Sequence, residues 1–117
     1  MASPNSPAEV YERLRDAWAQ ADAQAAADLY APDGVYYDAD NQVHRGREAV
    51  LGHLKGYFAT RGPVQYTLKR QVGGDGGVVL AEWTSASTDA GRRSTGLPGA
   101  SVIQLGRDGI VYHRDYQ

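Results

Sequence analysis

The C-terminal stretch of the chain reads GASVIQLGRDGIVYHRDYQ over residues 99–117. Two runs rich in apolar residues, 100–105 and 110–116, flank a short polar segment that contains Asp108 and Gly109. An Asp-Gly pair between two such runs is a strong local signal for a β-hairpin. The stretch therefore predicts two antiparallel strands, and the rest of the chain has to pack around them.

Side chains alternate between the two faces of a strand, so the second strand of this hairpin sorts its residues into two sets. One face receives Val111, His113 and Asp115, and the other receives Tyr112, Arg114 and Tyr116. A carboxylate that shares a face with a valine and a histidine is the first indication of a chemical site.

Composition limits the kind of protein. The chain has 117 residues, 42% of them hydrophobic, and a formal net charge of -2. One domain of this length buries about two-thirds of the surface of its unfolded chain, which leaves room for a cavity. The charge argues against a nucleic-acid partner. The sequence has no cysteine, which excludes disulfides and fits a reducing cytoplasm. No signal peptide or membrane-length apolar run is seen, so we expect a cytoplasmic protein without a membrane partner.

Two helices are predicted near the N-terminus. Ser6-Pro7-Ala8-Glu9 is a capping box with proline at the first helical position. The apolar stripe that follows at helical spacing is Val10, Leu14, Ala17, Trp18 and Ala21. Asp22 resembles the N-cap of a second, short helix that continues through Leu29, with Tyr30 closing its buried side, and Pro32 is expected to end it.

A small hairpin and a third helix are predicted next. Residues 34–38 and 42–45 flank a polar turn, and Tyr36 and Asp38 share one face of the first strand. The local sequence leaves open which face is inward, and Asp38 fits equally well as a turn residue that bonds its own backbone. The helix over residues 47–59 carries an apolar arc with His53 at its edge; the arc is Val50, Leu51, Leu54, Tyr57 and Phe58.

The remainder predicts strands and turns. Residues 64–72 alternate with Val64, Tyr66, Leu68 and Val72 on one face. The glycine-rich segment 73–77 precedes a strand-like run over 78–88, so a hairpin turn is favoured over a phosphate-binding loop. Another turn is expected at 89–91, and Gly96-Leu97-Pro98-Gly99 is expected to interrupt the following strand. The order of elements predicts an α+β fold whose helices cover one face of a curved sheet around a deep pocket.

Three phrases, AADLYAPDGVYYD, GREAV and SVIQLGRDGIVYHRDY, resemble the SnoaL-like branch of the nuclear transport factor 2-like superfamily. Within it the chain is most similar to limonene-1,2-epoxide hydrolases and ketosteroid isomerase-like proteins. The resemblance covers residues 1–117 as one domain and implies a cone-shaped fold with a strongly curved, mixed or antiparallel sheet. It also implies that Tyr36, Asp38 and Asp115 point inward and hold an attacking water, and that the chain forms a homodimer through its sheet.

The chain departs from both enzyme families at important positions. The Arg-x-Asp pair that supplies the acid of the hydrolases falls on Trp83 and Ser85. The oxyanion-hole tyrosine and aspartic acid of the isomerases fall on Leu14 and Ser101, although Asp38 matches the isomerase base. Neither mechanism therefore carries over intact.

The resulting hypothesis places two carboxylates in an apolar cavity. Asp115 is expected to be the main base, Asp38 an acid or second base, and Tyr36 and His113 orienting groups. Burial and mutual repulsion are expected to leave one of the two carboxyls protonated near neutral pH. The expected substrate-binding residues are Trp18, Tyr57, Phe58, Trp83, Leu97 and Ser101.

Purely structural roles for the same residues remain as alternatives to this hypothesis. His113 fits equally well as a structural partner of a neighbouring side chain, and Asp115 fits an ion pair with Arg70 or Arg114. His44 and His53 are expected at the surface or at an edge, and three scattered histidines without carboxylate spacing argue against a metal site.

Two classes of function remain. The favoured one is a cofactor-independent acid/base enzyme that acts on a small apolar substrate of polyketide or terpenoid type, as a cyclase, isomerase or epoxide hydrolase. The other is a non-catalytic module that binds a ligand or a protein partner. The enzyme is favoured because inward-pointing acids are costly to bury without a use.

Overall fold

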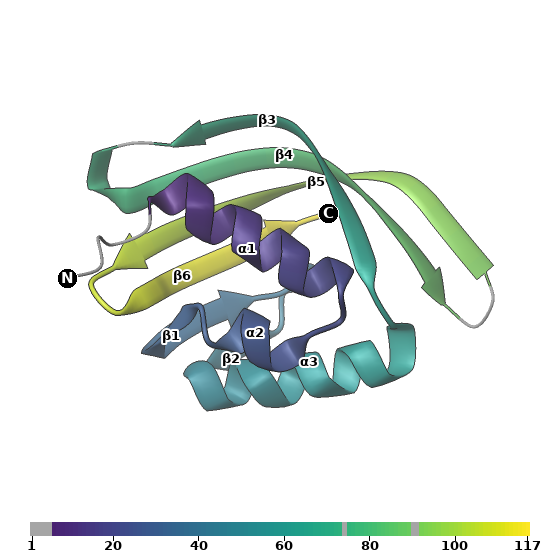
Figure 1. Cartoon of the computed structure of the whole chain (residues 1–117), viewed down its shortest axis with the longest axis horizontal. Coiled ribbons are helices and arrows are strands. Elements are labelled where there is room, and N and C mark those ends of the chain that lie inside the picture. Colours follow the sequence, from purple (N-terminus) through teal and green to yellow (C-terminus); the bar gives the residue numbers. More distant parts are fainter. Residues whose placement is uncertain (1–5, 74, 90–91) are drawn as a thin grey trace.

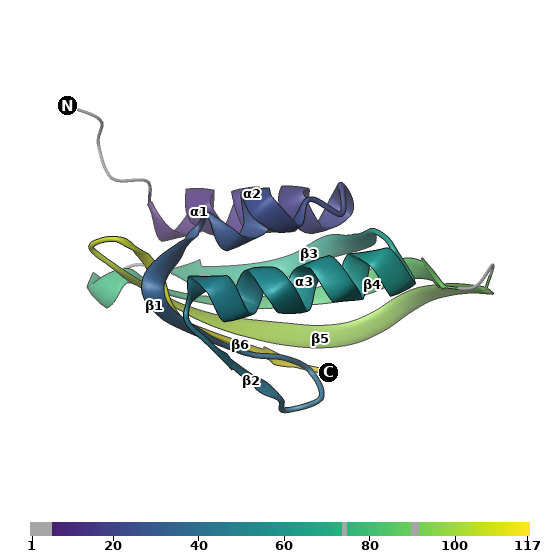
Figure 2. The same ribbon diagram turned by 90° about the horizontal axis from the view of Figure 1, so that it is seen from below.

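A six-stranded sheet with three helices on one of its faces makes up the described part of the computed structural model, which is residues 6–73, 75–89 and 92–117 (Figure 1). In chain order the elements are α1 (Pro7–Ala19), α2 (Ala23–Ala27), β1 (Tyr30–Tyr37), β2 (Val43–Arg45), α3 (Arg47–Arg61), β3 (Val64–Gly73), the 3-10 turn η1 (Asp75–Gly77), β4 (Val78–Asp89), β5 (Arg92–Gly106) and β6 (Gly109–Tyr116). The sheet curves beneath the helices (Figure 2). This is the α+β arrangement that the sequence predicts.

The strand order across the sheet is β2-β1-β6-β5-β4-β3. Neighbouring strands are antiparallel except for β1 and β6, which run parallel. The C-terminal hairpin is confirmed, since β5 pairs with β6 from Ala100↔Tyr116 to Gly106↔Gly109. The hairpin lies in the middle of the sheet, where β6 is the neighbour of β1 and β5 is the neighbour of β4.

A register shift in this hairpin corrects the predicted alternation. Leu105 pairs with Ile110, but Gln104 pairs with Tyr112, so Val111 is an extra residue on β6. A bulge of this kind reverses which residues face inward. Ile110 is therefore fully buried and Val111 is exposed, whereas His113 and Asp115 are buried as predicted.

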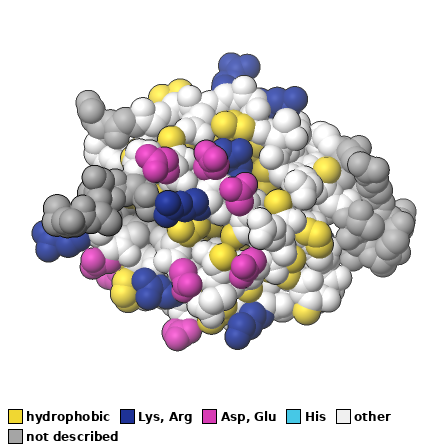
Figure 3. All heavy atoms as spheres, viewed as in Figure 1, with side chains coloured by type: hydrophobic (Ala, Val, Ile, Leu, Met, Phe, Trp, Pro, Cys, Tyr) yellow, Lys and Arg dark blue, Asp and Glu magenta, His cyan; other side chains and the backbone are white. Residues whose placement is uncertain are grey.

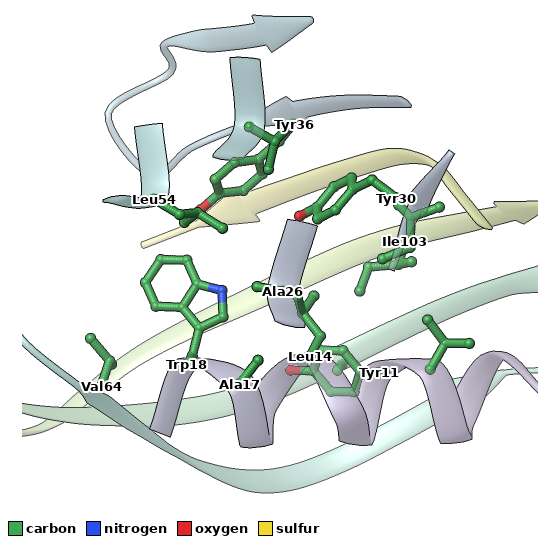
Figure 4. Packing of buried hydrophobic residues seen from close by; sticks show 14 of the residues in the cluster. Tyr11, Leu14, Ala17, Trp18, Ala26, Tyr30, Tyr36, Leu54, Val64 and Ile103 are labelled. Carbon is green, nitrogen blue, oxygen red and sulfur yellow. The ribbon is translucent and has the colours of Figure 1, made fainter. Parts of the chain in front are cut away.

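The first helix follows its sequence signals. Ser6 caps α1 by accepting a hydrogen bond from the backbone N–H of Glu9 at 3.2 Å, and Pro7 occupies the first turn. The predicted stripe is buried from Val10 to Trp18, together with Tyr11, but Ala21 lies beyond the end of the helix and is only part-buried. Figure 4 shows Trp18 projecting from α1 into the interior, where Tyr30 and Tyr36 extend their hydroxyl groups from β1. Trp18 makes edge-to-face contacts with Tyr57, Phe58 and Tyr66, at centroid distances of 5.2, 5.1 and 5.8 Å.

The second helix is shorter than predicted. Asp22 caps it as expected, accepting from the N–H of Ala25 at 3.0 Å, but the helix ends at Ala27 and β1 begins at Tyr30. Tyr30 pairs with Ile110 of β6, so tertiary pairing overrides the helical pattern. Pro32 does not end the helix. It lies within β1 between Tyr30 and Val35, where the register shifts.

Further register shifts correct two predictions about the long strands. A shift between Leu68 and Arg70 turns Val72 outward, where its side chain is 67% exposed instead of buried. Residues 96–99 do not interrupt the next strand, because β5 runs through them with a register shift opposite Ser85 to Ser87 and a positive φ of 71° at Gly96. The predicted turn at 89–91 contains residues 90 and 91, which lie outside the described residues. The third helix extends two residues beyond its predicted end.

Acidic and basic side chains are interspersed over the face that Figure 3 shows, which is the helical side of the molecule. No helix in the described ranges is both long and apolar enough to span a membrane.

Candidate functional site

A cavity of about 200 Å³ lies between the sheet and the helices. Its walls come from α1, α3 and four strands, which bring together residues from distant parts of the sequence. Five of the lining residues are tryptophan or tyrosine: Trp18, Tyr36, Tyr57, Tyr66 and Trp83. The polar lining includes both predicted carboxylates, Asp115 and Asp38, and His53. The site therefore combines an aromatic wall with two acids.

Asp115 is buried and accepts three hydrogen bonds from three strands. Its Oδ1 accepts from His113 Nε2 at 2.7 Å and from Ser101 Oγ at 2.6 Å. Its Oδ2 accepts from the Tyr36 hydroxyl at 2.8 Å. A carboxylate has about four acceptor positions, so one position on Oδ2 is left for a group in the cavity.

Two further hydrogen bonds hold two of the donors of this carboxylate in place. Trp83 Nε1 donates to Ser101 Oγ at 2.9 Å, so that the serine hydroxyl is directed to Asp115. The Tyr30 hydroxyl lies 2.5 Å from His113 Nδ1. When Tyr30 donates to Nδ1, His113 carries its proton on Nε2 and presents it to Asp115. The acid is thus held in one orientation by a connected network.

The electrostatics favour an ionised Asp115. Burial alone raises the pKa of a carboxyl, but the His113 imidazole and the hydrogen bonds from His113, Ser101 and Tyr36 outweigh it, and the pKa of Asp115 is lowered. Burial raises the pKa of Tyr30, Tyr36 and Tyr66 well above the ordinary value, with the charge of Asp115 adding to the effect. At neutral pH the site therefore holds a carboxylate among protonated phenols.

Asp38 belongs to a second cluster in the same cavity. Its Oδ1 accepts from the backbone N–H groups of Asp40 and Gln42, both at 2.9 Å, so Asp38 is a turn residue as well as a cavity residue. Its Oδ2 faces His44 Nε2 at 2.9 Å and His53 Nε2 at 3.7 Å. The two imidazole rings stack with a centroid distance of 3.8 Å. These histidines are part-buried and gathered, not scattered as predicted.

The predicted protonated carboxyl is not found. Burial raises the pKa of Asp38, but hydrogen bonds from His44, Gln42 and Asp40 lower it by more, so that this pKa also lies below its ordinary value. The pKa of His53 is lowered by burial and by His44. Each acid has its own set of donors, which removes the reason for the two to share a proton.

The structural alternatives for Asp115 can now be judged. Arg70 pairs with the exposed Glu82 at 2.7 Å, and the side chain of Arg114 hydrogen-bonds Asn41 and covers the Tyr37 ring. Neither arginine is a partner of Asp115, so the predicted ion-pair alternative is wrong. His113 is the buried hydrogen-bond partner of a neighbouring side chain, as the structural alternative predicts. That neighbour is Asp115, the candidate base.

The residues expected to bind substrate divide into three groups. Trp18, Tyr57 and Trp83 line the cavity, and Ser101 lines a separate small pocket that shares Trp18, Tyr66 and Asp115 with it. Phe58 packs in the core against Trp18 and is not among the lining residues. Leu97 is 46% exposed and lines neither space, because it lies on the outer part of β5 and not under the helices.

Sequence reasoning missed several members of the site. The sequence pattern predicts Tyr66 only as part of an apolar strand face, and Tyr30 only as the residue that closes the buried side of a short helix. His44 was recognisable in principle, because it pairs with Tyr36 in the β1–β2 hairpin and so lies on the same face. No local signal brings His53 of α3 to Asp38, since that contact depends on how the helix packs.

The three helices and the curved six-stranded sheet form a cone-shaped α+β fold of the nuclear transport factor 2-like type. The sequence profile of the SnoaL-like domain matches residues 11–113. The chain belongs to this SnoaL-like family. A comparison with curated proteins finds no match.

Solved structures agree with this assignment. A protein from Catenulispora acidiphila with a ketosteroid isomerase-like fold, in complex with trimethylamine, has a TM-score of 0.84 at 23% identity, over 97% of this chain and 87% of that one. An epoxide hydrolase of M. tuberculosis resembling limonene epoxide hydrolase has a TM-score of 0.81 at 23% identity, over 94% and 80%. A candidate SnoaL-like polyketide cyclase from Shewanella denitrificans has a TM-score of 0.78 at 13% identity, over 94% and 88%. At these identities the likeness establishes the fold.

Proposed function

We propose that this protein is an acid/base enzyme that acts on a small apolar substrate of polyketide or terpenoid type, as an epoxide hydrolase, a cyclase or an isomerase. The proposal rests on the environment of Asp115. This residue is a buried, ionised carboxylate with one acceptor position left, beside an aromatic cavity. A positioned carboxylate of this kind is suited to general-base catalysis, and the step requires no cofactor.

Asp115 would act as the base and a phenol of the cavity as the acid. In epoxide opening, Asp115 removes the proton of a water or substrate hydroxyl while that oxygen forms a bond to carbon. The epoxide C–O bond breaks, and its oxygen takes a proton from the Tyr66 hydroxyl, which is protonated because burial raises its pKa. Proton exchange with solvent then restores both groups. Tyr36 and His113 keep the carboxylate in place.

The lowered pKa of Asp115 favours one branch of this chemistry. A weakly basic carboxylate is poorly matched to removal of a proton from carbon, because the driving force for that transfer depends on basicity. The carboxylate is better matched to removal of a proton from an attacking water or hydroxyl oxygen, because that proton becomes more acidic as the oxygen bonds to carbon. Epoxide opening by water or by a substrate hydroxyl is therefore favoured over isomerisation and over carbon–carbon cyclisation, both of which require removal of a proton from carbon.

A panel of terpenoid and polyketide-like epoxides tests the proposal, with product formation followed by mass spectrometry. We expect Asp115→Asn to lower kcat/KM for any substrate found by about 10² to 10⁴-fold, the usual contribution of a general base. Asp16→Asn, on the exposed side of α1, is the matched control and should leave the rate unchanged. Circular dichroism checks that both variants fold. An Asp115→Asn variant that folds and keeps full activity would refute the assignment of the base.

A second candidate is a non-catalytic module that binds a small organic cation. Aromatic faces and ionised carboxylates together attract such cations, and the cavity offers five tryptophan and tyrosine side chains with Asp115 and Asp38. The trimethylamine complex of the Catenulispora acidiphila protein supports this candidate. Calorimetric titration with trimethylammonium separates the two: tight binding without turnover of any epoxide would favour the module.

A further inference from the structure

We infer that Asp38, His44 and His53 form a binding site for a divalent transition-metal ion of the zinc type, at the wall of the cavity. The three side chains offer one carboxylate oxygen and two imidazole nitrogens, all within 4.8 Å of one another. They come from the end of β1, from β2 and from α3, so three elements converge on one point. The inference does not depend on the function proposed for Asp115.

The distances suit a shared ion. Zinc bonds to nitrogen and carboxylate oxygen are about 2.0 to 2.2 Å long, which places two ligand atoms of one ion roughly 3 to 4 Å apart. Asp38 Oδ2 lies 2.9 Å from His44 Nε2 and 3.7 Å from His53 Nε2. Both imidazoles direct the same nitrogen, Nε2, toward the same oxygen. Small side-chain rotations that separate the stacked rings would therefore let all three atoms bind one ion.

The carboxylate is held in the orientation that a ligand needs. Two backbone N–H groups, of Asp40 and Gln42, occupy Asp38 Oδ1 and leave Oδ2 to the histidines. Such outer contacts fix first-shell ligands in metal sites and contribute to affinity. His44 is fixed in turn by its register opposite Tyr36, and His53 by its place on α3.

The donor set indicates the class of metal. Two imidazoles and one carboxylate suit zinc, cobalt, nickel or iron(II), whereas magnesium and calcium prefer oxygen ligands only. Three protein ligands leave at least one coordination position open, as in catalytic zinc sites. Because Asp38 and His53 line the same cavity as Asp115, that position would be accessible from the cavity. An ion there would polarise a substrate oxygen or bind water as a Lewis acid.

Metal titration of the purified, chelator-treated protein tests the site directly. We expect one Co²⁺ per chain, with the visible absorption bands of a cobalt ion bound to nitrogen and oxygen, and displacement of that cobalt by Zn²⁺. The double variant His44→Gln/His53→Gln and the single variant Asp38→Asn should each weaken Co²⁺ binding by more than about 100-fold. Loss of an outer partner alone typically costs 10 to 100-fold, and these are the ligands themselves.

Two control variants make the result specific. Asp40→Asn removes an acid of the same turn whose side chain is outside the ligand set, and it should change affinity by less than about fivefold. Asp115→Asn should keep cobalt binding even where it abolishes turnover, which separates this inference from the proposed function. Circular dichroism confirms folding of each variant. Absence of stoichiometric binding by the wild-type protein, or unchanged binding by the folded double variant, would overturn the inference.

Discussion

Asp115 shows how a buried acid can be kept ionised. Its three donors come from β1, β5 and β6, and two of them have further partners in Trp83 and Tyr30. Removing any donor would leave a buried oxygen short of a partner, which typically costs about 1 to 3 kcal/mol. The network is therefore part of the stability of the fold as well as of the candidate chemistry.

The contribution of Asp115 to stability should depend on pH. Its folded-state pKa lies below the unfolded value of about 3.9, so its stabilisation is complete above roughly pH 5 and is lost as pH falls through the folded pKa. In urea unfolding, the free-energy difference between wild type and Asp115→Asn should shrink from pH 5 to pH 3. A difference that stays constant over this range for Asp115→Asn would contradict the lowered pKa.

Among the elements, β6 owes its position to the turn that precedes it. Gly109 has a φ of 123°, and a Cβ atom there would lie 2.7 Å from the carbonyl oxygen of Leu29. The Ile110 N–H donates to that same carbonyl at 2.9 Å, so the turn between α2 and β1 and the start of β6 meet closely. Only glycine fits both the backbone conformation and the contact.

Two alanine substitutions should therefore have opposite effects on the free energy of unfolding. Gly109→Ala should destabilise the protein by about 1 to 3 kcal/mol, because it strains the backbone and clashes with residue 29. Gly52→Ala on the exposed side of α3, where a Cβ atom meets nothing within 4 Å, should stabilise it by about 0.5 to 1 kcal/mol. Urea denaturation measures both. A neutral Gly109→Ala would show that the turn has another conformation.

The elements also show why sequence reading fails where it does. Capping residues located the starts of α1 and α2, because the hydrogen bonds involved span only three residues. The errors at Val72 and Val111 both follow register shifts, each of which turns the next side chains to the other face. A bulge depends on the partner strand, so the alternation of one strand cannot reveal it.

For the molecule as a whole, the outer face of the sheet is the surface that suits the expected homodimer. Val72, Leu80 and Tyr116 line a shallow hollow there, and all three are exposed. Arg70 and Glu82, which form an ion pair, also line the hollow. In a dimer with a two-fold axis, Arg70 of each copy can therefore face Glu82 of the other copy. We propose that two copies associate through this face.

Sedimentation equilibrium tests the dimer. Leu80→Glu adds a charge to the centre of the hollow and should shift the protein to monomer, because burying an unpaired carboxylate is unfavourable. Val43→Glu, an equally exposed valine-to-acid change on β2 away from this hollow, should leave the dimer intact. A wild-type protein that is monomeric at high concentration, or a dimer that survives Leu80→Glu, would count against the proposal.

The sequence by itself determined the hairpins, the helix starts, the buried stripe of α1 and the class of fold, because those features depend on hydrogen bonds and periodicity among near neighbours. Alternation placed His113 and Asp115 on one face of their strand, and the family resemblance implied that Tyr36 and Asp115 point inward. Only the tertiary structure decided which groups meet. The hydroxyl of Tyr36 reaches Asp115 across 79 positions of sequence, and that of Tyr30 reaches His113 across 83. His53 meets Asp38 because α3 packs against the β1–β2 hairpin. Such contacts follow from packing and register across the sheet, which no local pattern encodes.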